Sequence, residues 1–137
     1  AMLVESRRRQ VGAELVLPVI EENCQVLADP QRLEQVLVNL LLNALDAVAG
    51  VEHRRVEIVV RHRDVCCELV IRDDGPGIPE AAMPHLFEPF FTTKPSGQGL
   101  GLGLAISRMI VRELGGEIEV RNGESGGAEF CVMLERV

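Results

Sequence analysis

The sequence predicts an α/β (α+β) two-layer sandwich, in which helices cover one face of a mixed, mostly antiparallel sheet of about five strands. Three observations support this fold class: segments with the pattern of strands, segments with the pattern of helices, and glycine- or proline-rich turns between them. Their order is strand, helix, two strands, glycine turn, irregular segment, helix and hairpin. The 137 residues are 47% hydrophobic and 26% charged, which is typical of one globular domain with a substantial core.

The first elements lie before the long central helix. Residues 1–10 are expected to end a helix or linker that arrives from an upstream region, and residues 11–137 to form the domain proper. Residues 14–20 are apolar after Glu14 and include Pro18, which is typical of an edge strand.

The long helix is predicted from Asp29, an N-cap residue, and Pro30, at the first helical position, to about Ala49, with Gly50 ending it. The remaining elements are predicted as strands at 56–61 and 65–72, a helix at 102–114, and two hairpin strands at 117–121 and 128–134. Four prolines make residues 79–100 irregular.

Composition excludes several classes of function. The formal net charge of −7 disfavours nucleic acid and anionic lipid as partners, and the absence of Trp and Tyr removes aromatic stacking platforms for single strands. No apolar run is long enough to insert into a membrane. The four cysteines form no CxxC pair, so a zinc site is not indicated, and we interpret them as reduced thiols of a cytosolic protein.

From Gln35 onward, the long helix is apolar except for four polar residues: Gln35, Asn39, Asn43 and Asp46. Their spacing places them within roughly 80° on one face. A solvent-facing stripe is the alternative interpretation. Asparagine is a poor helix former, however, and its carbonyl oxygen can bind a hard cation such as Mg²⁺, so the stripe also indicates a site.

Asp73 continues the inward-facing parity of the second predicted strand of the pair. A carboxylate there is costly to bury unless it accepts hydrogen bonds, and the amino group of a ligand base would supply one. An Asx turn within DDGPG is the alternative. Gly75 and Gly77 allow the backbone to approach a ligand closely or to adopt positive φ, which a turn also requires.

A second glycine-rich segment precedes the last helix. Gly97, Gly99, Gly101 and Gly103 alternate and then open that helix, so bare backbone N–H groups and a helix N-terminus predict an anion site. Neither a Walker A loop nor a G-x-G-x-x-G fingerprint is present.

Together these motifs resemble the nucleotide-binding domain of histidine kinases, in the superfamily shared with gyrase, the 90-kDa heat-shock chaperone and the mismatch-repair ATPases. The corresponding boxes are NLLLNALDA (39–47), DDGPG (73–77), FEPFF (87–91), GLGLGL (99–104) and GGAEFCVML (126–134). The tract FFTTKPSGQGLGLGLAIS, with Asp46 where many relatives carry lysine, is most similar to the nitrogen-regulatory and C4-dicarboxylate sensor kinases. The resemblance implies the Bergerat-type ATP-binding fold.

The resemblance also implies roles for individual residues. Asn43 would ligate Mg²⁺, Asn39 would help to hold the metal or the phosphates, and both are assigned as catalytic. Asp73 would accept the adenine amino group, and Gly75 and Gly77 would let the base lie against the sheet.

Residues of about 79–100 would form a lid over the nucleotide, and Gly99, Gly101 and Gly103 would wrap the phosphates. Lys94 would contact a phosphate, although a solvated lysine is the alternative. Phe87, with the other phenylalanines of its box, would anchor the lid or dock on a neighbouring domain, with simple packing as the alternative. The further nucleotide contacts expected are Asp46, Ile78, Phe87, Thr93, Gly97, Leu100 and Leu102.

By resemblance, the chain is expected to be the ATP-binding half of a protein-histidine kinase. Asn39 stands where the ATPases of the superfamily place a glutamate base, which favours phosphotransfer over hydrolysis. None of His53, His62 and His85 has the sequence context of the phosphoacceptor.

The γ-phosphoryl group of Mg-ATP would therefore pass to a histidine on a dimerisation domain absent from this chain, and then to an aspartate of a response regulator. The expected location is cytoplasmic, as the cytosolic part of a membrane-bound sensor. A serine/threonine kinase of the anti-sigma type and a non-catalytic docking module switched by nucleotide are the alternatives.

Overall fold

A computed structural model describes residues 2–18, 28–62, 65–92 and 102–135 of the chain. Its five-stranded sheet has the order β1-β2-β3-β5-β4. The strands are β1 (Glu14–Val16), β2 (Arg55–His62), β3 (Cys66–Asp73), β4 (Glu117–Asn122) and β5 (Ala128–Glu135). The β1–β2 pair is parallel and the other three pairs are antiparallel. The predicted mixed, mostly antiparallel sheet is confirmed.

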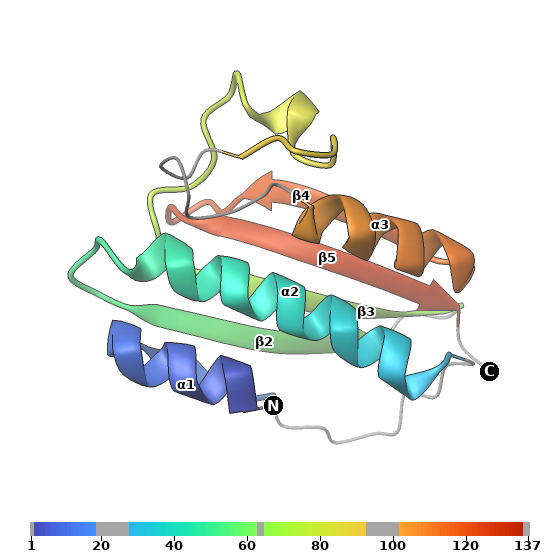
Figure 1. Cartoon of the computed structure of the whole chain (residues 1–137), viewed down its shortest axis with the longest axis horizontal. Coiled ribbons are helices and arrows are strands. Elements are labelled where there is room, and N and C mark those ends of the chain that lie inside the picture. Colours follow the sequence, from blue (N-terminus) through green and yellow to red (C-terminus); the bar gives the residue numbers. More distant parts are fainter. Residues whose placement is uncertain (1, 19–27, 63–64, 93–101, 136–137) are drawn as a thin grey trace.

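Three helices lie side by side over one face of this sheet (Figure 1). They are α1 (Met2–Val11), α2 (Pro30–Val48) and α3 (Gly103–Glu113). As predicted, Asp29 is the N-cap of α2, where its carboxylate accepts a hydrogen bond of 3.0 Å from the Gln31 N–H. The two-layer sandwich is therefore confirmed.

Most element bounds agree with the sequence prediction to within one residue. The exception is the edge strand predicted at 14–20, because β1 ends at Val16 and residues 19–27 lie outside the described residues. Within the described part of the irregular segment 79–100, the structure has one short 3₁₀ helix, η1 (Met83–His85). None of the helices described is long and apolar enough to cross a membrane.

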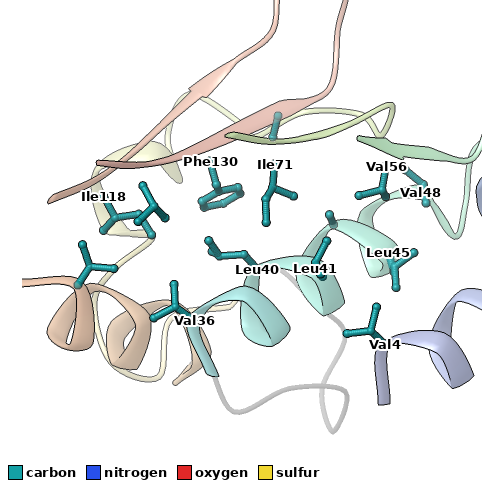
Figure 2. Packing of buried hydrophobic residues seen from close by; sticks show 14 of the residues in the cluster. Val4, Val36, Leu40, Leu41, Leu45, Val48, Val56, Ile71, Ile118 and Phe130 are labelled. Carbon is teal, nitrogen blue, oxygen red and sulfur yellow. The ribbon is translucent and has the colours of Figure 1, made fainter. Parts of the chain in front are cut away.

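The core lies between α2 and the centre of the sheet (Figure 2). Helix α2 buries a stripe at helical spacing: Val36, Leu40, Leu41, Ala44, Leu45 and Val48. Leu40 and Phe130 of β5 are among the largest side chains that are completely enclosed. Val4 of α1 points toward Leu45 and belongs to the same core, so α1 packs as part of this body (Figure 2).

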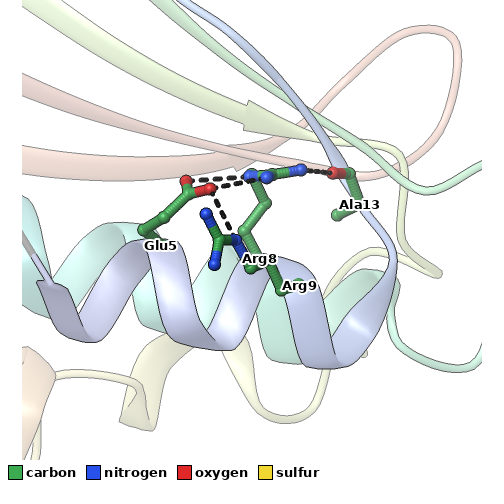
Figure 3. A network of polar contacts seen from close by, with 4 residues as sticks. All are labelled: Glu5, Arg8, Arg9 and Ala13. Carbon is green, nitrogen blue, oxygen red and sulfur yellow. Dashed lines mark hydrogen bonds and ion pairs between the residues drawn. The ribbon is translucent and has the colours of Figure 1, made fainter.

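Three charged side chains of α1 form a network of hydrogen bonds and ion pairs (Figure 3). Glu5 accepts hydrogen bonds of 2.6 and 2.9 Å from Arg8 and one of 3.2 Å from Arg9. The Arg8 guanidinium holds the pKa of the Glu5 carboxyl at about 2 and also donates to the carbonyl oxygen of Ala13 at 3.2 Å. These contacts fasten the C-terminal end of α1 to the chain that follows it.

The expectation that the cysteines are reduced thiols is wrong at Cys67, within the part of the chain that the structure describes. Cys66 and Cys131 are free thiols, whereas Cys67 is disulfide-bonded. Adjacent residues of a strand point to opposite faces, so Cys66 and Cys67 lie in different surroundings. Formation of a disulfide depends on which segments meet in the fold, and sequence spacing does not reveal this.

Truncation of Leu40 to alanine is expected to lower the free energy of unfolding by about 3 kcal/mol, because the side chain is fully enclosed and a cavity would remain. Leu3 in α1 is the matched control, since it is 67% exposed and its truncation should change stability by about 0.5 kcal/mol or less. Urea denaturation of both variants measures the difference. Equal losses would contradict the assignment of the core.

Candidate functional site

A cavity of about 330 Å³ opens between the C-terminal half of α2, the end of β3 and the segment that follows β3. Its walls combine polar groups from α2 and β3 with apolar side chains from several elements. The lining residues are Asn43, Asp46, Ala47, Asp73, Pro76, Gly77, Ile78, Pro79, Leu86, Phe91, Thr92, Leu104, Ala128 and Phe130. A mostly apolar pocket of this size with a few convergent polar groups is typical of a small-molecule site.

Only part of the polar stripe of α2 lines this cavity. Asn43 and Asp46 line it, whereas Asn39 is not among the lining residues. The Asn39 side-chain nitrogen instead lies 3.3 Å from Ser107 Oγ and 3.4 Å from the carbonyl oxygen of Gly103, which joins α2 to α3. The predicted role of Asn39 in holding a metal or phosphates stays a prediction.

Asp73 is 4% exposed at the end of β3, in the wall of the cavity. Its Oδ1 accepts hydrogen bonds from the N–H groups of Gly75 at 2.9 Å and Ala128 at 3.3 Å. Burial raises the pKa of the Asp73 carboxyl above its ordinary value, although these two hydrogen bonds oppose the shift. Among the described residues no hydrogen bond to Oδ2 is found, so one oxygen holds the turn and the other can accept from a ligand.

The turn after β3 is fixed by a side chain that sequence analysis missed. Asn122, the last residue of β4, accepts from the Ile78 N–H at 2.8 Å and donates to the Ile78 carbonyl at 3.0 Å. Gly77 has φ of +81°, and a Cβ there would lie 3.0 Å from Asn122 Oδ1. In sequence, Asn122 is only one of several turn-forming residues in RNGESGG, so nothing there separates it from a hairpin residue.

Gly127 allows β5 to begin directly beside Asp73. Its φ is +74°, and a Cβ at this position would lie 1.8 Å from the Asp73 carbonyl oxygen. No side chain fits there, and the close approach brings the Ala128 N–H to the Asp73 carboxylate. The glycine pair before Ala128, predicted as part of a hairpin turn, therefore also shapes the site.

The phenylalanines of the FEPFF motif do not form one cluster. Phe91 lines the cavity, whereas Phe87 packs against the core and lies under the Arg108 guanidinium at 5.3 Å. Phe90 is 72% exposed and has φ of +66°, a left-handed conformation that is rare for a bulky residue. Direct contact between Phe87 and a nucleotide, expected from the sequence, stays a prediction because Phe87 is not among the lining residues.

The glycine-rich segment lies only partly within the described residues. Thr93, Lys94, Gly97, Gly99, Leu100 and Gly101 lie outside the described residues. Leu102 is the N-cap residue of α3 and Gly103 its first residue, and the next residue, Leu104, lines the cavity. The N-terminus of α3 therefore lies beside the cavity, where its backbone N–H groups can meet an anion.

Five apolar or neutral lining residues from the segment after β3 were not predicted individually: Pro76, Pro79, Leu86, Phe91 and Thr92. This proline-rich stretch has no regular periodicity, so its inward positions carry no signal in the sequence.

A larger cleft of about 640 Å³ lies at the end of β3 and the turn between β4 and β5. It is lined mainly by charged and glycine residues. Its arginines are already paired, with Arg72 Nε 3.2 Å and Arg121 Nε 2.9 Å from Glu129 oxygens. Because no aliphatic or aromatic residue lines this cleft, the smaller cavity beside Asp73 is the better candidate for a nucleotide.

The cavity offers one amide ligand for a metal. Within the described ranges, no group of three or more His, Cys, Asp and Glu side chains gathers as a ready metal site. The Asn43 side-chain amide borders the cavity, and oxygen ligands of this kind suit Mg²⁺, which commonly takes its other ligands from phosphates and water.

Comparison with protein families gives a match over residues 28–137. The matching model is described as histidine kinase-, DNA gyrase B- and HSP90-like ATPase. The matched range contains every residue described above as lining the cavity.

Curated relatives include the C4-dicarboxylate transport sensor protein DctB of Pseudomonas aeruginosa, which is 46% identical over 127 residues, and DctB of Rhizobium meliloti, 42% identical over 137 residues. These alignments cover 92% and 98% of the chain but 21% of each relative. The chain thus spans about a fifth of the length of these relatives.

Solved structures with the same fold include the catalytic domain of histidine kinase ThkA, with a TM-score of 0.82 and 33% identity over 98% of this chain and 88% of that one. Full-length ShkA in complex with AMPPNP has a TM-score of 0.83 and 29% identity over 99% of this chain and 28% of that one.

Replacement of Asp73 by asparagine is expected to raise the melting temperature at pH 7. The variant keeps an oxygen acceptor for the Gly75 and Ala128 N–H groups but removes a charge that burial disfavours. Because the folded-state pKa is raised, the stability contributed by the protonated carboxyl is complete below its ordinary pKa of about 3.9 and is lost as pH rises through the folded-state pKa. The advantage of D73N should therefore disappear in acid.

Thermal unfolding of D73N and the wild type between acid and neutral pH measures this difference. The control is E119Q, which removes a charge from an exposed position of β4. A melting temperature of D73N below that of the wild type at neutral pH would show that the charged carboxylate stabilises the fold.

Proposed function

The chain belongs to the histidine kinase-, DNA gyrase B- and HSP90-like ATPase family, as a catalytic ATPase domain of the sensor-kinase type, and from this premise we propose how its site works. The domain binds Mg-ATP in the cavity beside Asp73 and donates the γ-phosphoryl group to a histidine of a dimerisation domain outside this chain. The observation that carries the proposal is the buried Asp73 carboxylate, with one oxygen engaged by the fold and the other available to a ligand.

Asp73 selects adenine by hydrogen bonding. An adenine amino group donates to Asp73 Oδ2 while the base lies between apolar side chains such as Ile78 and Phe130. Guanine presents a carbonyl oxygen at the equivalent ring position. This oxygen and the Asp73 carboxylate are both acceptors, so neither gains a hydrogen bond from the other in a buried site. The cavity should therefore discriminate against GTP.

Asn43 would hold Mg²⁺ at the phosphate end of the nucleotide through its side-chain oxygen. The ion, when bound, offsets the negative charge of the phosphate oxygens. The N-terminus of α3 lies beside the cavity at Leu104. Its backbone N–H groups carry partial positive charge and therefore also attract the phosphates. The predicted contacts from Lys94 and the glycines at 97, 99 and 101 complete the proposal for the phosphates.

The site is poorly equipped to activate water. Among the described lining residues, the carboxylates are Asp46 and Asp73. Asp46 is paired with Arg7, and Asp73 is assigned to the base end of the nucleotide. Asn39 cannot accept a proton at neutral pH, and its amide contacts α3. Without a general base, transfer to a histidine nucleophile is favoured over hydrolysis.

The likeness to ShkA supports nucleotide binding, because that structure was determined in complex with AMPPNP. The curated relatives are named as sensor proteins, which supports a histidine-bearing dimerisation domain and a response regulator as partners and a cytoplasmic location. Neither an anti-sigma type of serine/threonine kinase nor a non-catalytic docking module is favoured by these relatives.

Calorimetric titration with AMPPNP is expected to show binding that Mg²⁺ strengthens, with no comparable binding of the GTP analogue. Asn43→Ala should weaken binding in Mg²⁺ by about tenfold or more, equivalent to at least about 1.4 kcal/mol, and should abolish most of the Mg²⁺ dependence. Gln35→Ala is the matched control, because Gln35 lies on the same stripe of α2 but is exposed and does not line the cavity. An unchanged Mg²⁺ dependence in N43A would exclude the metal assignment.

Phosphotransfer is tested by mixing this chain with γ-labelled ATP and a separately expressed, histidine-bearing dimerisation domain of a sensor histidine kinase. We expect acid-labile label on the added domain and none on this chain. Substitution of the acceptor histidine in the added domain should remove the label. Acid-stable label on serine or threonine would instead support the alternative kinase activity.

A further inference from the structure

Helix α1 is firmly attached to the helix that forms one wall of the nucleotide cavity. Val4 and Val11 of α1 are buried in the same core as Leu45 of α2. Arg54 Nη1 donates a hydrogen bond of 2.6 Å to the Val11 carbonyl oxygen at the end of α1. The position of α1 relative to α2 is therefore set by packing and by a satisfied helix terminus.

One side chain of α1 reaches the rim of the cavity. Arg7 approaches Asp46 Oδ1 with Nε at 2.8 Å and Nη2 at 2.7 Å. The two side chains are 39% and 25% exposed, so the contact is partly shielded from water. Asp46 lines the cavity three residues after Asn43, on the same face of α2.

The charge of Asp46 matters because the proposed ligand is a polyanion. A carboxylate in the cavity wall repels phosphate groups, and the chain already carries a net charge of −7. A guanidinium within hydrogen-bond distance neutralises that carboxylate locally and holds it in one orientation. The three arginines of RRR are not equivalent, since Arg8 and Arg9 contact Glu5 and Arg7 contacts α2.

We propose that Arg7 is a positioning residue for nucleotide binding, acting through Asp46. By neutralising Asp46, it removes a repulsive charge from the path of the phosphates, and the packing of α1 on α2 thereby controls the electrostatics of the site. A shift of α1 away from α2 would remove the Arg7 guanidinium from the Asp46 carboxylate beside the phosphates. This inference rests on the proposed binding of ATP in this cavity.

The test compares the binding of AMPPNP and adenosine to a set of variants of this chain by calorimetry. R7A should weaken AMPPNP binding by roughly fivefold and adenosine binding by less than about twofold, because adenosine carries no phosphate. The charge-conserving variant R7K should recover most of the loss. R9A is the matched control and should bind both ligands as the wild type does, because Arg9 contacts Glu5 on the outer face of α1.

Two further measurements identify Asp46 as the group through which Arg7 acts. In a D46N background, R7A should change AMPPNP affinity by less than about twofold, because no carboxylate remains to be neutralised. In about 1 M salt, where the Debye length falls to about 3 Å, the effect of R7A in the wild-type background should diminish. Circular dichroism verifies that each variant retains its helices.

Each outcome decides between these explanations. Equal weakening of AMPPNP and adenosine by R7A would indicate a structural role and overturn the inference. An equal effect of R7A with and without Asp46 would mean that Arg7 contacts the ligand directly, which also overturns it. Wild-type binding of AMPPNP with no effect of R7A overturns this inference alone. Failure of the unchanged chain to bind AMPPNP overturns the proposed function and this inference with it.

Discussion

The site depends on burying the Asp73 carboxylate at the end of β3. Its Oδ1 accepts hydrogen bonds from the turn at Gly75 and from Ala128, the first residue of β5, which is 55 residues after Asp73. The close approach that this requires explains Gly127, where any Cβ would overlap the Asp73 carbonyl oxygen. Burial raises the pKa of the carboxyl because it disfavours the charged form. A hydrogen-bond donor on a ligand would stabilise that charged form.

Helix α2 distributes its polar stripe among three different neighbours. Asn39 bonds to α3, Asn43 faces the cavity, and Asp46 pairs with Arg7 of α1. The opposite side of the same helix is enclosed against the sheet, which keeps these three residues in fixed relative positions. One rigid helix thus connects its two neighbouring helices and the cavity, so movement of either helix can change the environment of a bound nucleotide.

The arrangement explains why a fold shared with ATPases can serve a kinase. The polar groups in the described cavity wall suit recognition of a base and neutralisation of phosphate charge, and no carboxylate there is placed to activate water. In the proposed function, the nucleophile comes from another protein domain, whose docking decides when transfer occurs. In this proposal, bound ATP is hydrolysed only slowly, so it remains intact until the domain with the acceptor histidine docks.

The sequence by itself determined the order and bounds of nearly all elements, because periodicity, caps and glycine turns are local signals. It also predicted Asn43, Asp46, Asp73 and Gly77 as candidate site residues, and these four line the cavity. Only the tertiary structure decided which neighbours these residues meet. The pairing of Asn122 with residue 78, the contact of Arg7 with Asp46 and the engagement of Asn39 by α3 all join positions more than 35 residues apart. Such contacts depend on how the helices and strands pack. Local sequence patterns do not show which distant segments pack together.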